Sequence, residues 1–184
     1  MRSADSANPF ALLTRALAFA AHKHRDQRRK DAEASPYINH PIALAELLVH
    51  EGGIDDPLVL AAALLHDTLE DTETTLDELR AAFGAEIAGI VAEVSDDKSL
   101  EKQERKRRQI EHAPQLSARA QLVKLADKTC NLRDVADHPP ASWSLERRRE
   151  YFEWAKAVVD RIRGPHPVLE GVFDAAYARC PSTE

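Results

Sequence analysis

An adjacent histidine and aspartate, His66 and Asp67, end an alanine- and leucine-rich run that covers residues 58–65. Glu70 and Asp71 follow directly, and positions four apart lie on the same face of a helix. Four side chains that can bind a metal or transfer a proton thus gather at the end of a helix of core composition. Burying several carboxylates without a partner is very costly. A divalent cation is a suitable partner, so the sequence predicts a metal site to which other segments contribute ligands.

Two further segments contain the expected ligands. His40 precedes Pro41, and proline suits the first position of a helix, so we expect His40 at a helix N-terminus. Asp127 follows the mainly apolar residues 122–126 and should point inward. Taken alone, a histidine or aspartate near a helix end is more often a cap, a surface group or a satisfied core residue. The metal hypothesis therefore depends on the whole set, which is His40, His66, Asp67 and Asp127. Such a nitrogen and oxygen set suits Mn, Fe, Co, Ni or Zn and disfavours Ca.

Glu70 and Asp71 lie one helical turn beyond His66 and Asp67, which is too far along the helix for first-choice ligands. We expect these two carboxylates to transfer protons or to orient water instead. Their alternative role is that of ordinary charged groups at a helix end.

The composition is that of a compact globular protein. The chain has 184 residues, of which 43% are hydrophobic and 30% are charged, and this length suits one domain with a sizeable core. The two cysteines, Cys130 and Cys180, provide no disulfide framework, as is usual in the reducing cytosol. We find no signal-peptide pattern and no apolar run of membrane-spanning length. We therefore expect a cytoplasmic protein without membrane contact.

The net charge of −6 argues against a general nucleic-acid-binding protein, but the charge is unevenly spread. Residues 65–97 contain ten acidic residues and one basic residue, whereas basic residues cluster at 23–30 and 98–108. An acidic metal centre beside cations would suit a nucleotide that carries several phosphates. We expect Arg29 and Lys30 to contact such a ligand. Most of the second cluster, which is interleaved with glutamates, is expected to form a solvated surface.

The hydrophobic pattern predicts helices throughout the chain, and no segment shows the sustained alternation of a strand. Pro57 begins the helix that carries His66 and Asp67, while Thr75 and Glu78 form a capping box at the start of the next helix. The site should lie in a central cleft between the helices of an all-α bundle. We expect helices at about residues 9–24, 41–53, 57–71, 75–84, 85–94, 100–112, 118–136, 145–163 and 167–178.

These motifs resemble one enzyme family. The ordered histidines and aspartates resemble those of the HD-domain metal-dependent phosphohydrolases. Longer strings are similar to the hydrolase domain of the RelA/SpoT alarmone enzymes, and more closely to the small stand-alone alarmone hydrolases of the metazoan SpoT-homologue type. The resemblance covers about residues 10–165, so we expect a single HD-type hydrolase domain over residues 1–184. The strings that carry it are Arg29-Lys30 and residues 36–41 (PYINHP), 66–72 (HDTLEDT), 95–98 (SDDK), 104–107 (ERKR), 124–133 (KLADKTCNLR) and 150–155 (EYFEWA).

The resemblance implies an activity and a metal. The family hydrolyses guanosine 3′-diphosphate 5′-di- or triphosphate, written (p)ppGpp, removes the 3′-pyrophosphate and leaves GDP or GTP. Mn²⁺ is the usual metal, and the matching residues of this chain assign hydrolysis to Glu70 and Asp71. The metal would be held by His40, His66, Asp67 and Asp127.

The resemblance also implies a set of residues that bind the substrate. Arg29 would stack its guanidinium group on the purine, Lys30 would bind phosphate, and Asn131 would approach the nucleoside. Arg147 and Tyr151, four positions apart, would close the pocket over phosphates, or would serve only helix packing and surface charge. The remaining member of the set is Tyr37, which would line the pocket or pack in the core.

Three functions are compatible with these sequence features. The first is an alarmone hydrolase, which should degrade (p)ppGpp without making it, because the chain has no room for a synthetase domain. The second is another HD enzyme, for example one that removes the 2′-phosphate of NADPH or acts on another nucleotide. The third is a module that binds a nucleotide without turnover, against which the complete set of acids and histidines argues. The sequence indicates no obligatory protein partner.

Overall fold

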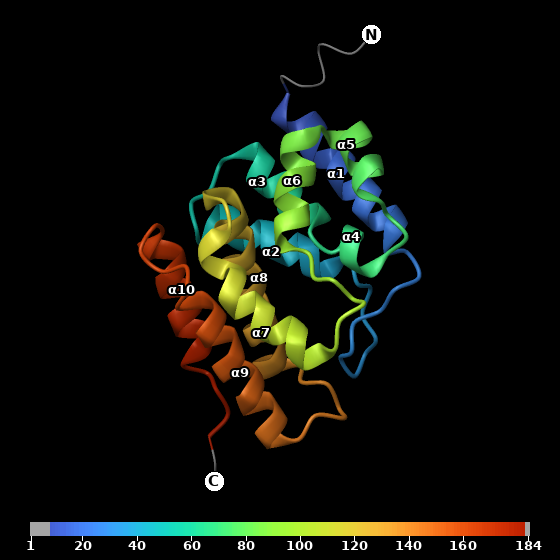
Figure 1. Cartoon of the computed structure of the whole chain (residues 1–184). Helices are drawn as coiled ribbons and strands as arrows, with labels where there is room; N and C mark the ends of the chain where they lie inside the picture. Colours follow the sequence, from blue (N-terminus) through green and yellow to red (C-terminus); the bar gives the residue numbers. More distant parts are fainter. Residues whose placement is uncertain (1–7, 183–184) are drawn as a thin grey trace.

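The computed structural model describes residues 8–182, which form helices joined by turns and loops (Figure 1). Within residues 8–182 no strand is present, and one isolated bridge joins Arg28 and Pro36. The all-α fold expected from the sequence is confirmed. Across the same residues, no helix has both the length and the apolar character that a membrane crossing requires. The helices are α1 (Pro9–Lys23), α2 (Asn39–His50), α3 (Pro57–Leu65), α4 (Thr68–Asp71), α5 (Leu76–Phe83), α6 (Ala85–Val94), α7 (Lys102–His112), the 3-10 helix η2 (Ala113–Gln115), α8 (Ala118–Asp137), α9 (Leu145–Val159) and α10 (Pro167–Tyr177).

Helix α3 lies at the centre of the fold because it is apolar on every side. Every residue from Val59 to Leu65 is buried, as expected of a helix without a polar face. The three consecutive alanines at 61–63 keep the helix thin, and α1, α2, α6 and α8 pack around it. Asp56 caps its start, since the carboxylate accepts a hydrogen bond from the N–H of Leu58 at 2.9 Å. Because α3 is surrounded by other helices, the residues that follow its C-terminal end lie inside the bundle.

Helix α8 is the second central element, and it packs against α2, α3, α6, α9 and α10 (Figure 1). Its buried face includes two lysines, Lys124 and Lys128, which need polar or aromatic partners in the interior. The ammonium group of Lys124 donates to the carbonyl of Val94 at 2.7 Å, and that of Lys128 lies 4.3 Å from the ring centroid of Trp154. These contacts hold α8 against α6 and α9, and thereby place Asp127.

The helix that the sequence predicts from residue 57 to residue 71 is interrupted, because α3 ends at Leu65 and α4 begins at Thr68. Side chains compete for the last carbonyl groups of α3 at this point. The hydroxyl of Thr68 donates to the carbonyl of Leu65 at 2.7 Å, and Nδ1 of His66 lies 2.8 Å from the carbonyl oxygen of Ala63. The interruption turns the backbone so that His66 lies in a tight turn rather than inside a continuous helix.

Other helix ends differ from the prediction by smaller shifts. Helix α2 begins at Asn39, so His40 lies in its first turn rather than before it; the N–H of His40 donates to the carbonyl of Tyr37 at 3.0 Å. Helix α9 ends at Val159, and tight turns follow it before Gly164, whose φ is +115°. A glycine tolerates this left-handed conformation without strain.

Candidate metal centre and active-site cleft

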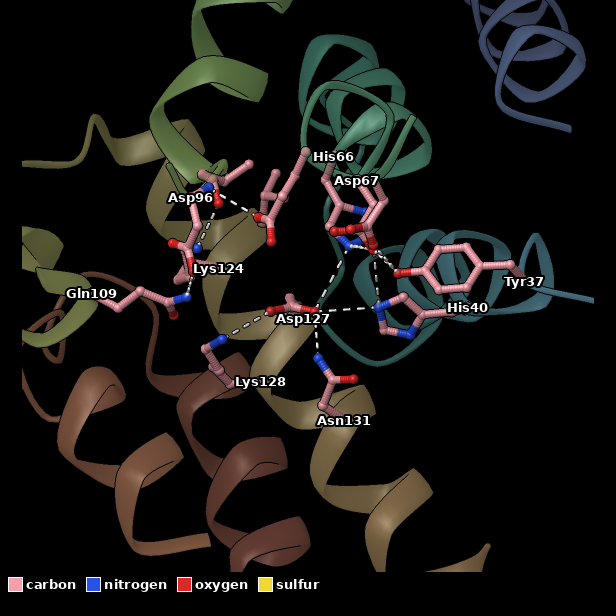
Figure 2. A pocket seen from close by; sticks show the side chains of 14 residues that line it. Tyr37, His40, His66, Asp67, Asp96, Gln109, Lys124, Asp127, Lys128 and Asn131 are labelled. Atoms are coloured by element: carbon pink, nitrogen blue, oxygen red, sulfur yellow. Dashed lines mark hydrogen bonds and ion pairs between the residues drawn. The ribbon is translucent and has the colours of Figure 1, made fainter. Parts of the chain in front are cut away.

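Three separate elements bring the four candidate metal ligands together (Figure 2). His40 comes from α2, His66 and Asp67 come from the turn between α3 and α4, and Asp127 comes from α8. The candidate ligand atoms of His40, His66 and Asp67 all lie within 4.8 Å of one another. Oδ1 of Asp127 lies 3.3 Å from Nε2 of His40 and 3.8 Å from Nε2 of His66. The fold thus assembles two imidazoles and two carboxylates around one point.

This arrangement fits a divalent cation because electron-rich atoms face one another. Nδ1 of His66 donates to the carbonyl oxygen of Ala63, so Nε2 carries a lone pair in the neutral ring. That Nε2 is buried, has no hydrogen-bond partner among the described residues, and lies 2.9 Å from Oδ2 of Asp67. A lone pair and carboxylates at such distances repel one another unless a positive charge lies between them. The donor set suits a divalent transition metal.

The pKa values of His66, Asp67 and Asp127 are also shifted in the directions that favour a positive charge at the cluster. Burial lowers the pKa of His66, but the carboxylate of Asp67 outweighs burial and raises that pKa to about 9. Burial raises the pKa of Asp67, whereas the charge of His66 holds it below its usual range. Burial also raises the pKa of Asp127, but the ammonium group of Lys128 and the two histidines together hold that pKa well below its usual range. The centre therefore attracts a positive charge, either a proton or a metal cation.

Glu70 is held by the loop that follows α6. Its Oε2 accepts a hydrogen bond from the backbone N–H of Asp96 at 2.9 Å, and a guanidinium nitrogen of Arg105 lies 3.8 Å from Oε1. Burial raises the pKa of Glu70 to about 6, although the N–H of Asp96 acts in the opposite direction. A carboxyl group with a pKa near 6 can exchange protons with a substrate or water near neutral pH.

Asp71 is held by a tyrosine and a lysine. The hydroxyl of Tyr37 lies 2.5 Å from Oδ2 of Asp67 and 3.2 Å from Oδ2 of Asp71, and Lys98 pairs with the other oxygen of Asp71. Burial raises the pKa of Tyr37 well above its usual range, so the phenol stays protonated and donates. The N–H of Asp71 still bonds the carbonyl of Asp67 at 2.8 Å, which preserves the one-turn spacing expected from the sequence. Tyr37 therefore links a candidate ligand to a candidate catalytic acid.

These groups line one cavity of about 180 Å³. Asn131 also lines it, as expected for a residue one turn beyond Asp127, and its Nδ2 donates to Oδ1 of Asp127 at 2.6 Å. Tyr37 also lines this cavity. The full lining is Tyr37, His40, His66, Asp67, Glu70, Asp71, Val94, Asp96, Gln109, Val123, Lys124, Asp127, Lys128 and Asn131.

Arg29, Lys30, Arg147 and Tyr151, the other residues expected to bind substrate, lie outside these walls. Arg29 lies over the ring of Tyr37 at 5.6 Å and pairs with Asp134. Arg147 lies over Trp143 at 4.5 Å, and the ring of Tyr151 is 5.4 Å from that of Trp143. Of the four, Arg29 contacts a residue of the cavity wall, Tyr37.

Three cations from separate segments act on one another through their charges. Burial lowers the pKa of Lys102, and the positive charges of Arg147 and Lys30 lower it further. These three cations come from α7, from α9 and from the loop before α2. Such a group of cations is suited to a ligand with several negative charges.

Sequence reasoning missed several polar residues of the site. It predicts a solvated surface for most of the second basic cluster, yet Lys98 pairs with Asp71, and Arg105 lies near Glu70. Asp96 and Gln109 also line the cavity. One signal was available in the sequence for two further lining residues: the pair Lys124 and Lys128, four positions apart in a helix with an apolar face.

Comparison with known proteins identifies the family. The HD-domain family pattern matches residues 16–153. Guanosine-3′,5′-bis(diphosphate) 3′-pyrophosphohydrolase MESH1 of Xenopus tropicalis is 57% identical over 167 residues, which cover 91% of this chain and 93% of that protein. The protein of the same name from Homo sapiens is 58% identical over 160 residues, which cover 87% and 89%.

Solved structures agree with this assignment. A structure described as a metazoan ortholog of SpoT that hydrolyses ppGpp and plays a role in starvation responses superposes with a TM-score of 0.89 and 50% identity. The match covers 92% of this chain and 95% of that one. A protein from Listeria monocytogenes gives a TM-score of 0.63 and 29% identity over 79% of this chain and 98% of its own. The chain belongs to the HD-domain family and, within it, to the MESH1-type guanosine-3′,5′-bis(diphosphate) 3′-pyrophosphohydrolases.

Proposed function

We propose that the protein is one HD-type hydrolase domain that converts (p)ppGpp to GDP or GTP and pyrophosphate with Mn²⁺ as its metal. Relatives that are 57% and 58% identical over nearly their whole length carry the name of this reaction. One observation carries the proposal: the candidate metal ligands and Glu70, a carboxyl group of raised pKa, line the same polar cavity.

The metal is assigned to the imidazoles of His40 and His66 and to the carboxylates of Asp67 and Asp127. When bound, the cation supplies a Lewis acid that polarises a phosphoryl oxygen and lowers the pKa of a water molecule. Mn²⁺ is proposed because it accepts a mixed nitrogen and oxygen set and is the usual metal of the family. The hydroxyl of Tyr37 and the amide of Asn131 each donate to one of the two carboxylates, which orients the carboxylates toward the cluster.

Proton transfer is assigned to Glu70, and the orientation of water to Asp71. The attacking water bonds to the phosphorus that is esterified at the ribose 3′ oxygen, and Glu70 accepts the proton that this water loses. The bond between that phosphorus and the 3′ oxygen breaks, the 3′ oxygen takes up a proton, and pyrophosphate leaves. Asp71 is suited to its role because Lys98 pairs with one of its oxygens, while the other lies 3.2 Å from the hydroxyl of Tyr37.

Substrate binding is assigned to the residues around the cavity. Lys30, Lys102 and Arg147 neutralise the phosphates, because their like charges act on one another and an anion would relieve this repulsion. Arg29 stacks on the purine with the ring of Tyr37 behind its guanidinium group. The remaining contacts are those of Asn131 with the nucleoside and of Tyr151 at the edge of the pocket.

A comparison of substrates tests the proposal. Purified protein is stripped of metal, reloaded with Mn²⁺, and assayed at matched concentrations of ppGpp, NADPH and deoxynucleoside triphosphates. We expect the largest kcat/KM for ppGpp, and no turnover of it before Mn²⁺ is added. Faster release of phosphate from NADPH would identify a 2′-phosphatase instead, and tight binding of ppGpp without products would identify a nucleotide-binding module.

A further inference from the structure

Asp134 lies two helical turns beyond Asp127 on the same face of α8. Its Oδ2 pairs with a guanidinium nitrogen of Arg29, and the same oxygen lies 3.9 Å from Nδ1 of His40. His40 is a candidate metal ligand, and Arg29 is the candidate contact to the purine. The carboxylate of Asp134 therefore lies between the candidate metal centre and the loop that carries Arg29.

The two candidate metal histidines differ in how their second ring nitrogen is satisfied. Nδ1 of His66 donates to the carbonyl oxygen of Ala63 at 2.8 Å. This carbonyl group is near the end of α3. His40 lies in the first turn of α2, and its Nδ1 is buried without a hydrogen-bond partner among the described residues. The carboxylate that those residues bring within 4.0 Å of this nitrogen is Asp134. A small rotation of the side chain, or one bridging water, completes the contact.

The opposite nitrogen of His40 faces the metal centre. Nε2 lies 3.3 Å from Oδ1 of Asp127 and 3.9 Å from Oδ2 of Asp67, so it is the nitrogen that can bind a metal. For Nε2 to carry the lone pair, the proton of the neutral ring must reside on Nδ1. An acceptor beside Nδ1 favours that tautomer, whereas an empty apolar surface would not.

We propose that Asp134 is a positioning residue for both the candidate metal ligand His40 and the candidate substrate-binding residue Arg29. It accepts the Nδ1–H of His40, which leaves Nε2 free for the metal, and it holds the guanidinium group of Arg29 beside Tyr37. A carboxylate behind a metal-binding imidazole fixes the tautomer and the orientation of the ring. The role toward Arg29 rests on the proposed function, whereas the role toward His40 does not depend on any substrate.

Titration of the metal-free protein with Mn²⁺, without nucleotide, tests the role toward His40. Loss of such a supporting partner typically weakens metal binding by about 10–100-fold, which is the decrease expected for Asp134→Ala. Asp134→Asn should retain most of the affinity, because its amide oxygen can still accept the Nδ1–H. The matched control is Asp137→Ala, which removes a carboxylate one turn further along α8 that pairs with Arg179 at the surface. This control should bind Mn²⁺ like the wild type.

Circular dichroism and the thermal midpoint verify that each variant keeps its helices. Wild-type Mn²⁺ affinity in Asp134→Ala would overturn the inference, and so would equal losses of affinity in the alanine and asparagine variants.

Steady-state kinetics at saturating Mn²⁺ test the role toward Arg29. Both Asp134 variants should raise the KM for ppGpp, because neither retains the charge that holds the guanidinium group. An unchanged KM in both variants would overturn this half of the inference. If the alanine variant loses Mn²⁺ affinity while the wild-type protein does not hydrolyse ppGpp, the proposed function fails and the role toward His40 stands.

Discussion

The backbone N–H of Asp96 donates a hydrogen bond to the carboxylate of Glu70 at 2.9 Å, across 26 positions of sequence. Nε2 of Gln109 in turn donates to the side chain of Asp96 at 2.7 Å. The loop after α6 therefore fixes the position of Glu70, while burial raises the pKa of its carboxyl group to about 6. A group held in this way can accept a proton without first having to be ordered.

The first prediction concerns Glu70→Gln. The amide keeps the shape of the side chain but cannot accept a proton, so kcat should fall by about 10²–10⁴-fold. The affinities for Mn²⁺ and ppGpp should change little, because the lost interaction occurs only in the transition state. Asp71→Asn should behave similarly. Kinetics together with metal analysis measure both effects. Loss of bound metal in Glu70→Gln, with normal turnover after reloading, would show that Glu70 supports the metal instead.

The second prediction is the pH dependence of the wild-type enzyme. Only the ionised carboxylate of Glu70 accepts a proton, and its pKa is about 6. The value of kcat/KM should therefore decrease by roughly tenfold per pH unit as the pH falls below this pKa, and level off above it. Stopped assays at saturating Mn²⁺ give the profile. A rate that is constant across this range would argue against Glu70 as the base.

The third prediction concerns the metal centre. His66→Ala and Asp67→Ala each remove one candidate ligand from a cluster whose atoms lie within 4.8 Å of one another. Both variants should lose tight Mn²⁺ binding and turnover and keep their helical content. Isothermal titration and circular dichroism provide the two readouts. Full activity in either variant, after it is stripped of metal and reloaded, is incompatible with the assignment.

The fourth prediction separates binding from chemistry. Arg29→Ala and Lys30→Ala should chiefly raise the KM for ppGpp and leave Mn²⁺ binding and much of kcat intact, because these cations contact the substrate in both the ground and the transition state. The control is Arg163→Ala, since Arg163 pairs with Asp160 and Asp174 near the end of α9. Losses of kcat without a rise of KM would place Arg29 and Lys30 in the chemical step.

The fifth prediction concerns the core. Ala62 is fully buried in α3, where surrounding helices leave no room for a larger side chain. Ala62→Leu should decrease the free energy of unfolding by about 1–3 kcal/mol, as overpacking usually does. Urea titration measures the change. The matched control is Ala81→Leu at an exposed position of α5, where the same substitution should have little effect.

Much of the fold can be predicted from the sequence because the relevant signals are local. The apolar residues of α3 show no polar face, Asp56 precedes Pro57 at its start, and Thr75 caps the next long helix. The interruption at His66 was not predicted. It depends on which of several nearby donors takes the last carbonyls of α3, and composition does not reveal that choice.

In the site, too, features with a local sequence signal could be predicted, and features that depend on packing could not. The histidines and aspartates stand in recognisable strings, so their meeting could be predicted. The contacts of Lys98 and Arg105 with the two candidate catalytic acids could not, because a basic helix of this composition is usually solvated. The position of Asp134 behind His40 also depends on how α8 packs against α2, which no single segment specifies.

The most direct measurement is the fate of oxygen from solvent during turnover. The protein is incubated with Mn²⁺ and ppGpp in water enriched in ¹⁸O, and the products are separated by chromatography and weighed by mass spectrometry. The proposed attack on the phosphorus at the 3′ oxygen predicts unlabelled GDP and pyrophosphate that contains one ¹⁸O atom. Release of inorganic phosphate with a shortened 3′ chain, or ¹⁸O in the nucleoside, would contradict it.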